Sequence, residues 1–310
     1  MTTPPPHRGP RGLFAGIVTM DLQFAVPGFP ERNAKTYADA WAVAPGGPAT
    51  NAATVFAHLG GAATLVTGVG RHPLTDFIMA DLATSGIALV DLHAGQAVVP
   101  PIVSIISSRD NGDRTVITRR PDPVTTAPDP SILGAVDGAD ICLVDGFFLE
   151  AALALAARAR DRGVPVVLDG GSWKEGLERL LALTDIAVVS ERFRPPDLPA
   201  GTDVLTALHE RFGCRRIAVT RGERGIRAFE DGHRFEVAAA PVAAVDTLAA
   251  GDFFHGAFCF AHATGQSFPA ALAFAARVAG RSCAHFGTRA WLDHIDDLRG
   301  EAQSFAPARD

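Results

Sequence analysis

Seven residues near the C-terminus, Asp246 to Asp252, have the types and spacing that could hold an anion. They read Asp-Thr-Leu-Ala-Ala-Gly-Asp and join a strand-like run to a helical pattern that starts near residue 250. Small side chains at Ala249, Ala250 and Gly251 leave the first-turn amides uncovered, and these amides attract an anion together with the helix dipole. Asp252 would then either act as a general base toward an attacking hydroxyl or only favour the helix N-terminus electrostatically.

A second segment, Gly46-Gly47-Pro48-Ala49-Thr50-Asn51, also has the residue types of a ligand site. Paired glycines let the backbone approach a ligand closely, and the Asn51 amide in the following helix could bind sugar hydroxyls. The alternative is a simple Gly-Gly turn, with Pro48 at the first helical position and Asn51 an ordinary helix residue. Taken alone, the segment favours the simple turn.

Composition restricts how this chain could bind phosphate. It has 310 residues, 28 basic and 34 acidic, and its only lysines are Lys35 and Lys174. Neither lysine stands in the Gly-Lys-Ser/Thr context of a Walker A loop, so backbone amides or arginines must hold any phosphate. The net charge of −6 disfavours a nucleic-acid partner.

The cysteines and the apolar runs indicate the cellular compartment of the protein. The four cysteines form no Cys-x-x-Cys pair, which argues against a structural zinc site and fits a reducing cytoplasm. No apolar run reaches the roughly 18 residues of a membrane span, and the N-terminus lacks the apolar region of a signal peptide. We therefore expect a cytoplasmic protein with no membrane partner.

Short apolar runs alternate with amphipathic stretches along most of the chain. The pattern predicts strands over 13–20, 63–70, 141–146, 164–170, 185–190, 215–222 and 235–247, and helices over 48–60, 73–85, 149–162, 174–183, 203–212, 249–265 and 268–285. This succession predicts an α/β fold with a mostly parallel sheet covered by helices on both faces. We expect one domain over 12–298, with flexible termini at 1–11 and 299–310.

Two segments break this alternation, at about 22–46 and 96–121. The second holds two β-rich runs around Asn111-Gly112, which is a strong signal for a tight hairpin. Strands inserted in this way often cover a ligand site. We therefore expect a small β lid outside the main sheet.

The two motifs, in this order, resemble those of the PfkB family of carbohydrate kinases, which have the ribokinase-like fold. The family pattern is Gly-Gly-x-x-x-Asn, then Asp-Thr-x-Gly/Ala-Ala-Gly-Asp-x-Phe, and here the second reads DTLAAGDFF. The resemblance covers roughly 12–290 and includes Asp21 and the turn Thr220-Arg221-Gly222-Glu223-Arg224-Gly225. It implies a three-layer α/β/α sandwich with a β lid, use of ATP and Mg²⁺, and in many members K⁺.

The resemblance also implies residue roles. Asp252 would be the catalytic base, and the amides of Ala249, Ala250 and Gly251 would hold the transferring phosphoryl group. The sugar would contact Asp21, Gly46, Gly47 and Asn51, and the nucleotide would contact Ser190, Thr220, Gly222, Gly225, Gly280 and Cys283. Asp246 would belong to the monovalent-cation loop. Many members carry Asn-x-x-Glu, in which the Glu acts through water on Mg²⁺. This chain has Ser190-Glu191-Arg192-Phe193 at that place, so Glu191 would serve Mg²⁺ there only with a different spacing.

The substrate class follows from finer likenesses. The Ser-Glu-Arg-Phe form, the run 277–283 and Leu248 resemble the ketohexokinase-like branch, while GGPAT, 168–171 and 254–257 resemble bacterial sulfofructose kinases. Both groups phosphorylate ketoses. A nucleoside kinase of the same fold and a non-catalytic sugar or nucleotide sensor remain as alternatives.

Three further residues are candidates for the substrate side. Arg114 could reach sugar or phosphate from the lid, or could be a solvated strand end. Asn33 could reach a sugar in its own subunit or a partner's, since lid strands in this family often pair in a homodimer. Asp169 ends a strand, at the rim where α/β proteins bind ligands.

Overall fold

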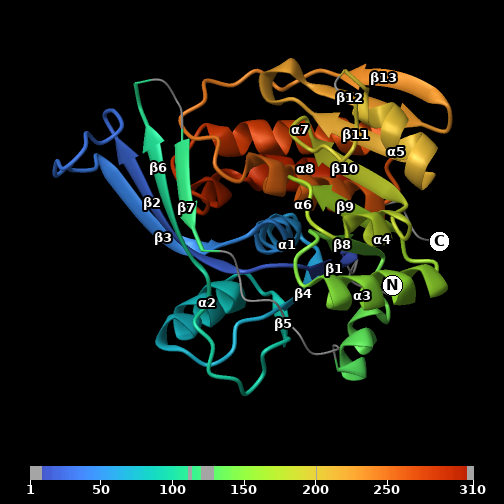
Figure 1. Cartoon of the computed structure of the whole chain (residues 1–310), viewed down its shortest axis with the longest axis horizontal. Helices are drawn as coiled ribbons and strands as arrows, with labels where there is room; N and C mark the ends of the chain where they lie inside the picture. The colour runs from blue at the N-terminus through green and yellow to red at the C-terminus, as the bar shows by residue number, and fades with distance from the viewer. Residues whose placement is uncertain (1–8, 111–113, 120–128, 200, 306–310) are drawn as a thin grey trace, which may run out of the picture.

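The central layer of the computed structural model is a nine-stranded sheet with the order β13-β12-β11-β10-β9-β8-β1-β4-β5 (Figure 1). The structure describes residues 9–110, 114–119, 129–199 and 201–305. The strands are β1 (Arg11–Ala15), β4 (Ala62–Thr67), β5 (Ala88–Asp91), β8 (Ile141–Val144), β9 (Val166–Gly170), β10 (Ile186–Ser190), β11 (Arg216–Thr220), β12 (Ile226–Glu230) and β13 (His233–Val237). The strands from β5 to β11 in this order pair in parallel, and β12 and β13 pair antiparallel at one edge. The predicted fold class is confirmed.

Helices cover both faces of this sheet, and each face has its own apolar core. One face carries α1 (Pro48–His58), α2 (Pro73–Thr84), α6 (Ala250–Ala263), α7 (Phe268–Cys283) and α8 (Asp296–Ser304). The other carries α3 (Leu149–Asp161), α4 (Leu177–Leu181), α5 (Val204–Phe212) and the 3₁₀ turn η1 (Pro130–Val136). Two more 3₁₀ turns are η2 (Gly222–Arg224) and η3 (Ala290–His294).

A second sheet stands apart from the first, at the left of Figure 1, and forms the lid. Its order is β3-β2-β6-β7, with β2 (Thr19–Val26), β3 (Ala40–Gly46), β6 (Ile102–Ser108) and β7 (Arg114–Thr118). The strand predicted over 13–20 is in fact two strands. The chain leaves the main sheet at Gly16, where a Cβ would lie 2.0 Å from the Asp145 carboxylate, and enters the lid three residues later. The predicted Asn111-Gly112 turn lies outside the described residues.

Two other boundaries differ from the prediction. The strand expected over 235–247 ends at Val237, and the chain then runs along α7, where the Val245 amide donates to the Cys283 carbonyl at 2.7 Å. Arg11 already belongs to β1, and 299–304 form the end of α8 with Ala302 buried, so flexible termini were wrong for these residues. Most residues of α8 are polar, so its few buried apolar residues give no clear helical pattern in the sequence. No helix in the described ranges is long and apolar enough to cross a membrane.

Helices α1 and α6 pack closely because Gly256 has no side chain. A Cβ at Gly256 would lie 2.2 Å from the Ala52 carbonyl oxygen of α1. We expect Gly256→Ala to lower the free energy of unfolding by about 1–3 kcal/mol, because the two backbones must separate. Urea denaturation measures this change. Gly300→Ala in α8 is the matched control, since a Cβ there meets open space and the substitution should stabilise the helix. Equal stability of Gly256→Ala and the native chain would contradict this packing.

Candidate active site

The N-terminus of α6 is open toward the solvent. Ala249, the residue before the helix, has a left-handed φ of 57°, and no side chain caps the helix. Gly251 is exposed, and a Cβ there would meet no atom within 4 Å. The first-turn amides of a helix have no intrahelical acceptor, so they remain free to donate to a ligand. This arrangement supports the anion site predicted from Ala249, Ala250 and Gly251.

Asp252 lies in this first turn and is joined to the second motif. The Asn51 side-chain amide donates to Asp252 Oδ2 at 2.9 Å, although the two residues are 201 positions apart. Burial of the carboxylate, and then the charge of Asp169, raise the pKa of Asp252 to about 7, while the Asn51 hydrogen bond acts in the opposite direction. A carboxyl group with this pKa can accept a proton near neutral pH.

Asp21 and the paired glycines lie beside each other where the lid joins α1. Thr19 Oγ1 donates to Asp21 Oδ1 at 2.6 Å, and burial raises the pKa of Asp21 to about 6. A Cβ at Gly46 would lie 2.0 Å from the Asp21 carboxylate, and Gly47 has a φ of 100°. Both positions therefore require glycine. The segment forms the simple turn, with Pro48 starting α1, and it also packs against Asp21.

Arg289, which the sequence analysis did not single out, fixes the orientation of Asn51. Its Nη1 donates to Asn51 Oδ1 at 3.2 Å, so the Asn51 NH₂ group must face Asp252. The guanidinium also pairs with Asp81 at 3.2 Å and donates to the Pro45 carbonyl at 2.8 Å. It thereby connects the lid, α1 and α2. Arg289 stands in no motif, so only its long-range contacts reveal it.

The lid reaches the anion loop through Arg114. Its Nη1 donates to Thr247 Oγ1 at 2.7 Å, which places the guanidinium beside the segment that leads to α6. Arg114 and Asp21 project from the same face of the lid, because strand side chains alternate. Asn33 is exposed in the loop after β2, and this loop begins at the strand end that lies roughly 17 Å along β2 from Asp21. The structure does not bring Asn33 to the site of its own subunit.

The residues predicted for the nucleotide lie along neighbouring strand ends. Ser190 and Thr220 are paired in register at the ends of β10 and β11, and Ser190 Oγ donates to the Gly171 carbonyl at 2.7 Å. Gly222 and Gly225 have φ values of 58° and 75°, which form the turn after β11.

Gly280 and Cys283 lie on α7 and support the chain that leads to the anion loop. A Cβ at Gly280 would lie 3.0 Å from the Ala240 side chain, so α7 packs closely on this segment. The Cys283 carbonyl accepts from the amides of Val245 and Asp246 at 2.7 and 3.2 Å. Both residues therefore position the backbone on which the loop depends.

The two residues predicted for metals have other partners here. Glu191 is exposed and forms an ion pair with Arg224, so its side chain is directed to the turn after β11. Asp246 is buried, and its two oxygens accept from the Leu248 and Gly287 amides at 3.0 and 3.1 Å. Within the described ranges no three acidic, histidine or cysteine side chains cluster as a metal site.

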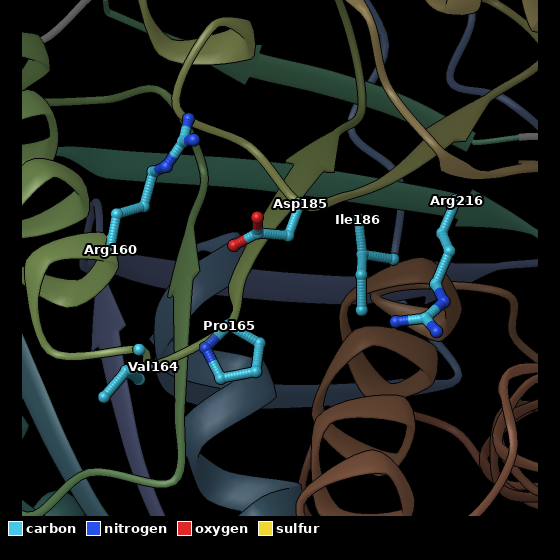
Figure 2. Close-up of a pocket in the computed structure, with 7 residues that line it drawn as sticks. Arg160, Val164, Pro165, Asp185, Ile186 and Arg216 are labelled. Carbon is cyan, nitrogen blue, oxygen red and sulfur yellow. The ribbon is translucent and has the colours of Figure 1, made fainter. Parts of the chain in front are cut away.

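A separate pocket lies at the opposite, amino-terminal ends of β9, β10 and β11 (Figure 2). Its charged side chains already have partners: Arg160 donates to the Ala182 carbonyl, Arg216 to Glu230, and Asp185 accepts from the Val166 amide. Ligands of parallel α/β sheets bind at the carboxyl ends of the strands. The candidate active site is therefore at α6 and the lid.

Comparisons with known proteins agree with this geometry. A family model described as pfkB family carbohydrate kinase matches residues 13–295. The ribokinase of Bacillus subtilis is 23% identical over 276 residues, 88% of this chain and 93% of that protein. Mouse ketohexokinase is 24% identical over 295 residues, 87% of this chain and 95% of that protein. Arabidopsis thaliana ribokinase, solved with ribose and ATP, has a TM-score of 0.74 and 21% identity, and the match covers 97% of this chain and 99% of that one.

The fold and the family match define an enzyme that transfers a phosphoryl group to an alcohol. The chain belongs to the pfkB family of carbohydrate kinases, which phosphorylate sugars with ATP.

Proposed function

We propose that this enzyme is an ATP-dependent ketose kinase in which Asp252 is the general base. The observation that carries the proposal is the 2.9 Å hydrogen bond between Asn51 and Asp252. It joins the sugar-side motif to the open N-terminus of α6. A hydroxyl held by Asn51 would therefore lie next to both the base and the anion-binding amides.

The contacts suggest an order of events. Asp21, Asn51 and the backbone at Gly46-Gly47 hold the sugar, and Asp252 takes the proton of the reacting hydroxyl as it attacks the γ-phosphate. The first-turn amides of α6 then stabilise the charge that develops on the phosphoryl oxygens. Arg114 covers this point from the lid. Mg²⁺ on the nucleotide supplies further charge neutralisation of the phosphates.

The choice of a ketose depends on the sequence likenesses at 190–193, 248 and 277–283. The ribokinase and ketohexokinase relatives are about equally similar, so identity does not separate ribose from ketoses. Arg114 is exposed and forms no ion pair among the described residues, and an anionic ketose such as sulfofructose would gain a charge-assisted hydrogen bond from it.

A coupled ADP-release screen tests the substrate class. The panel contains fructose, other ketoses, sulfofructose, phosphosugars, ribose and nucleosides. We expect the highest kcat/KM with a ketose and a phosphorylated primary hydroxyl in the product by ³¹P NMR. The highest value with ribose or a nucleoside would contradict the ketose assignment. Sugar binding by calorimetry without ADP release from any substrate would favour the sensor.

For the monovalent cation, we propose that Asp246 supports the site. Its buried carboxylate holds the loop 246–248 against Gly287, and K⁺ would find an anionic group there. Because its oxygens each accept one amide, each retains a free lone pair for a cation.

The outer face of the lid favours a homodimer. Phe24 and Trp41 are paired in register on the face opposite Asp21, with 37% and 70% of their surfaces exposed, and Ile117 is on the same face with 60% exposed. Exposed apolar side chains on one face of a sheet favour association with a second copy. We expect Trp41→Glu to convert a dimer to a monomer in analytical ultracentrifugation.

Phe77→Glu is the matched control for the lid. Phe77 is an exposed aromatic residue on α2, with 44% of its surface exposed. The control variant should remain a dimer. A native chain that sediments as a monomer, or a dimeric Trp41→Glu variant, would contradict the lid interface.

A further inference from the structure

His255 is a buried residue of α6 that lies one turn after the proposed base. Only 5% of it is exposed. Its Nδ1 lies 2.6 Å from the Gly251 carbonyl oxygen and 3.3 Å from Asp169 Oδ2, and its Nε2 lies 3.1 Å from the Val188 carbonyl oxygen. Each of these neighbours is a hydrogen-bond acceptor, so each ring nitrogen faces an oxygen.

This geometry restricts which nitrogens of the ring can carry a hydrogen. A neutral imidazole carries one hydrogen, so one of its nitrogens would direct a lone pair at a carbonyl oxygen. A hydrogen on both nitrogens satisfies both contacts, so the 2.6 and 3.1 Å distances favour a doubly protonated ring. Asp169 is 4% exposed, and its Oδ2 has no hydrogen-bond partner in the described part of the chain. A doubly protonated ring would compensate the charge of this carboxylate.

The pair is joined to the peptide group that precedes the proposed base. Gly251 provides the carbonyl that His255 binds, and the amide of the same peptide group belongs to Asp252. The Asp169 charge raises the pKa of Asp252, and the His255 charge lowers it. The two halves of the pair therefore act on Asp252 in opposite directions.

Other ionisable groups surround this cluster from each packed element. The groups are Asp21 on β2, Asp145 after β8, Cys142 on β8, Cys259 on α6, Lys174 before α4, and Arg289, which reaches Asn51. The thiols stay neutral, because burial raises the pKa of Cys142 to about 12 and shifts that of Cys259 upward. Asp169 and a protonated His255 thus act on the pKa of Asp252 with opposite charges.

We propose that Asp169 and His255 form a buried ion pair that positions the first turn of α6 and offsets the effect of the Asp169 charge on Asp252. The proposal depends on the role of Asp252 as the base under the proposed function. His255 is a positioning residue, because it acts through the Gly251 peptide and through its charge. Asp169 likewise has this role in place of direct sugar binding.

The pH dependence of kcat tests the pair. Asp252 must be ionised to accept a proton, so activity falls as pH decreases through the pKa of Asp252, and any change that raises this pKa moves the acid limb to higher pH. We expect His255→Asn to move that limb upward by at least about one pH unit, because the Asp169 charge is no longer compensated. The double variant Asp169→Asn with His255→Asn removes both charges and should restore the limb to near its native position. A purely structural role would lower kcat equally at every pH, which would overturn the proposal.

His262→Asn is the matched control, because His262 is a mostly buried histidine on the same helix that packs on Phe258. It should leave the acid limb unchanged. A second measurement uses the native chain and does not depend on catalysis. ¹⁵N NMR of the histidine rings should show both His255 nitrogens protonated at pH 7. A ring with one unprotonated nitrogen would overturn the ion pair. Because this readout does not depend on catalysis, it separates failure of the pair from failure of the proposed function.

Discussion

Replacing Asp252 with asparagine is expected to lower kcat for sugar phosphorylation about 10²- to 10⁴-fold, the range that a positioned general base contributes. The asparagine oxygen can still accept the Asn51 amide, which donates at 2.9 Å in the native chain. The geometry of the first turn of α6 is therefore retained, and the variant loses mainly the ability to accept a proton. Calorimetry should show that it still binds sugar and ATP.

The matched control separates a base from a charge that only favours a helix N-terminus. Asp76 is the acidic residue in the first turn of α2, and it is exposed. Asp76→Asn removes a first-turn carboxylate without touching the site, so its kcat should be unchanged. If Asp252→Asn retained near-normal turnover, the electrostatic interpretation of this residue would be correct and the catalytic one wrong.

Local patterns were sufficient to predict the elements that carry the site. Glycine pairs, small residues and a following helical pattern lie within a few positions of each other at 46–51 and 246–252, so their backbone consequences are local. The structure agrees: α1 begins at Pro48 and α6 at Ala250. Arg114 could have been a solvated strand end or a residue that reaches the site from the lid; in the structure it is exposed and donates to Thr247.

Contacts between distant positions were not predictable in this way. The break of the first strand at Gly16 depends on the Asp145 carboxylate, which directly follows β8 and accepts the Ile17 amide at 3.0 Å. The apolar run around Gly16 does not indicate a contact with a residue so far away in the sequence. Asp169 was expected at the rim because strands end there, yet its side chain is buried against His255. The position of Asp169 in its strand predicts where it lies, but its contact with His255 is not evident from the sequence.

Arg289 is the clearest case of a residue without a local signal, because its partners come from β3, α1 and α2. We expect Arg289→Lys to lower kcat/KM for the sugar about 10²-fold, the cost of a small misplacement of a reacting group. A lysine keeps the positive charge beside Asp81. It cannot reproduce the planar set of donors that reaches Asn51, Pro45 and Asp81 together. The Asn51 amide would then be free to rotate away from Asp252.

The kinetic signature distinguishes this effect from general damage. The loss should fall on the sugar KM and on kcat, and the KM for ATP should stay near its native value, because among the described residues Arg289 donates to Asn51, Pro45, Asp81 and Thr288 and not to the residues predicted for the nucleotide. Arg281→Lys is the control: Arg281 donates to both carboxylate oxygens of Asp297 and to the His294 carbonyl, away from Asn51. It should retain native kcat/KM. If both lysine variants behaved alike, the orientation of Asn51 would not depend on Arg289, and the link from the lid to the base would have to run through Asp21 instead.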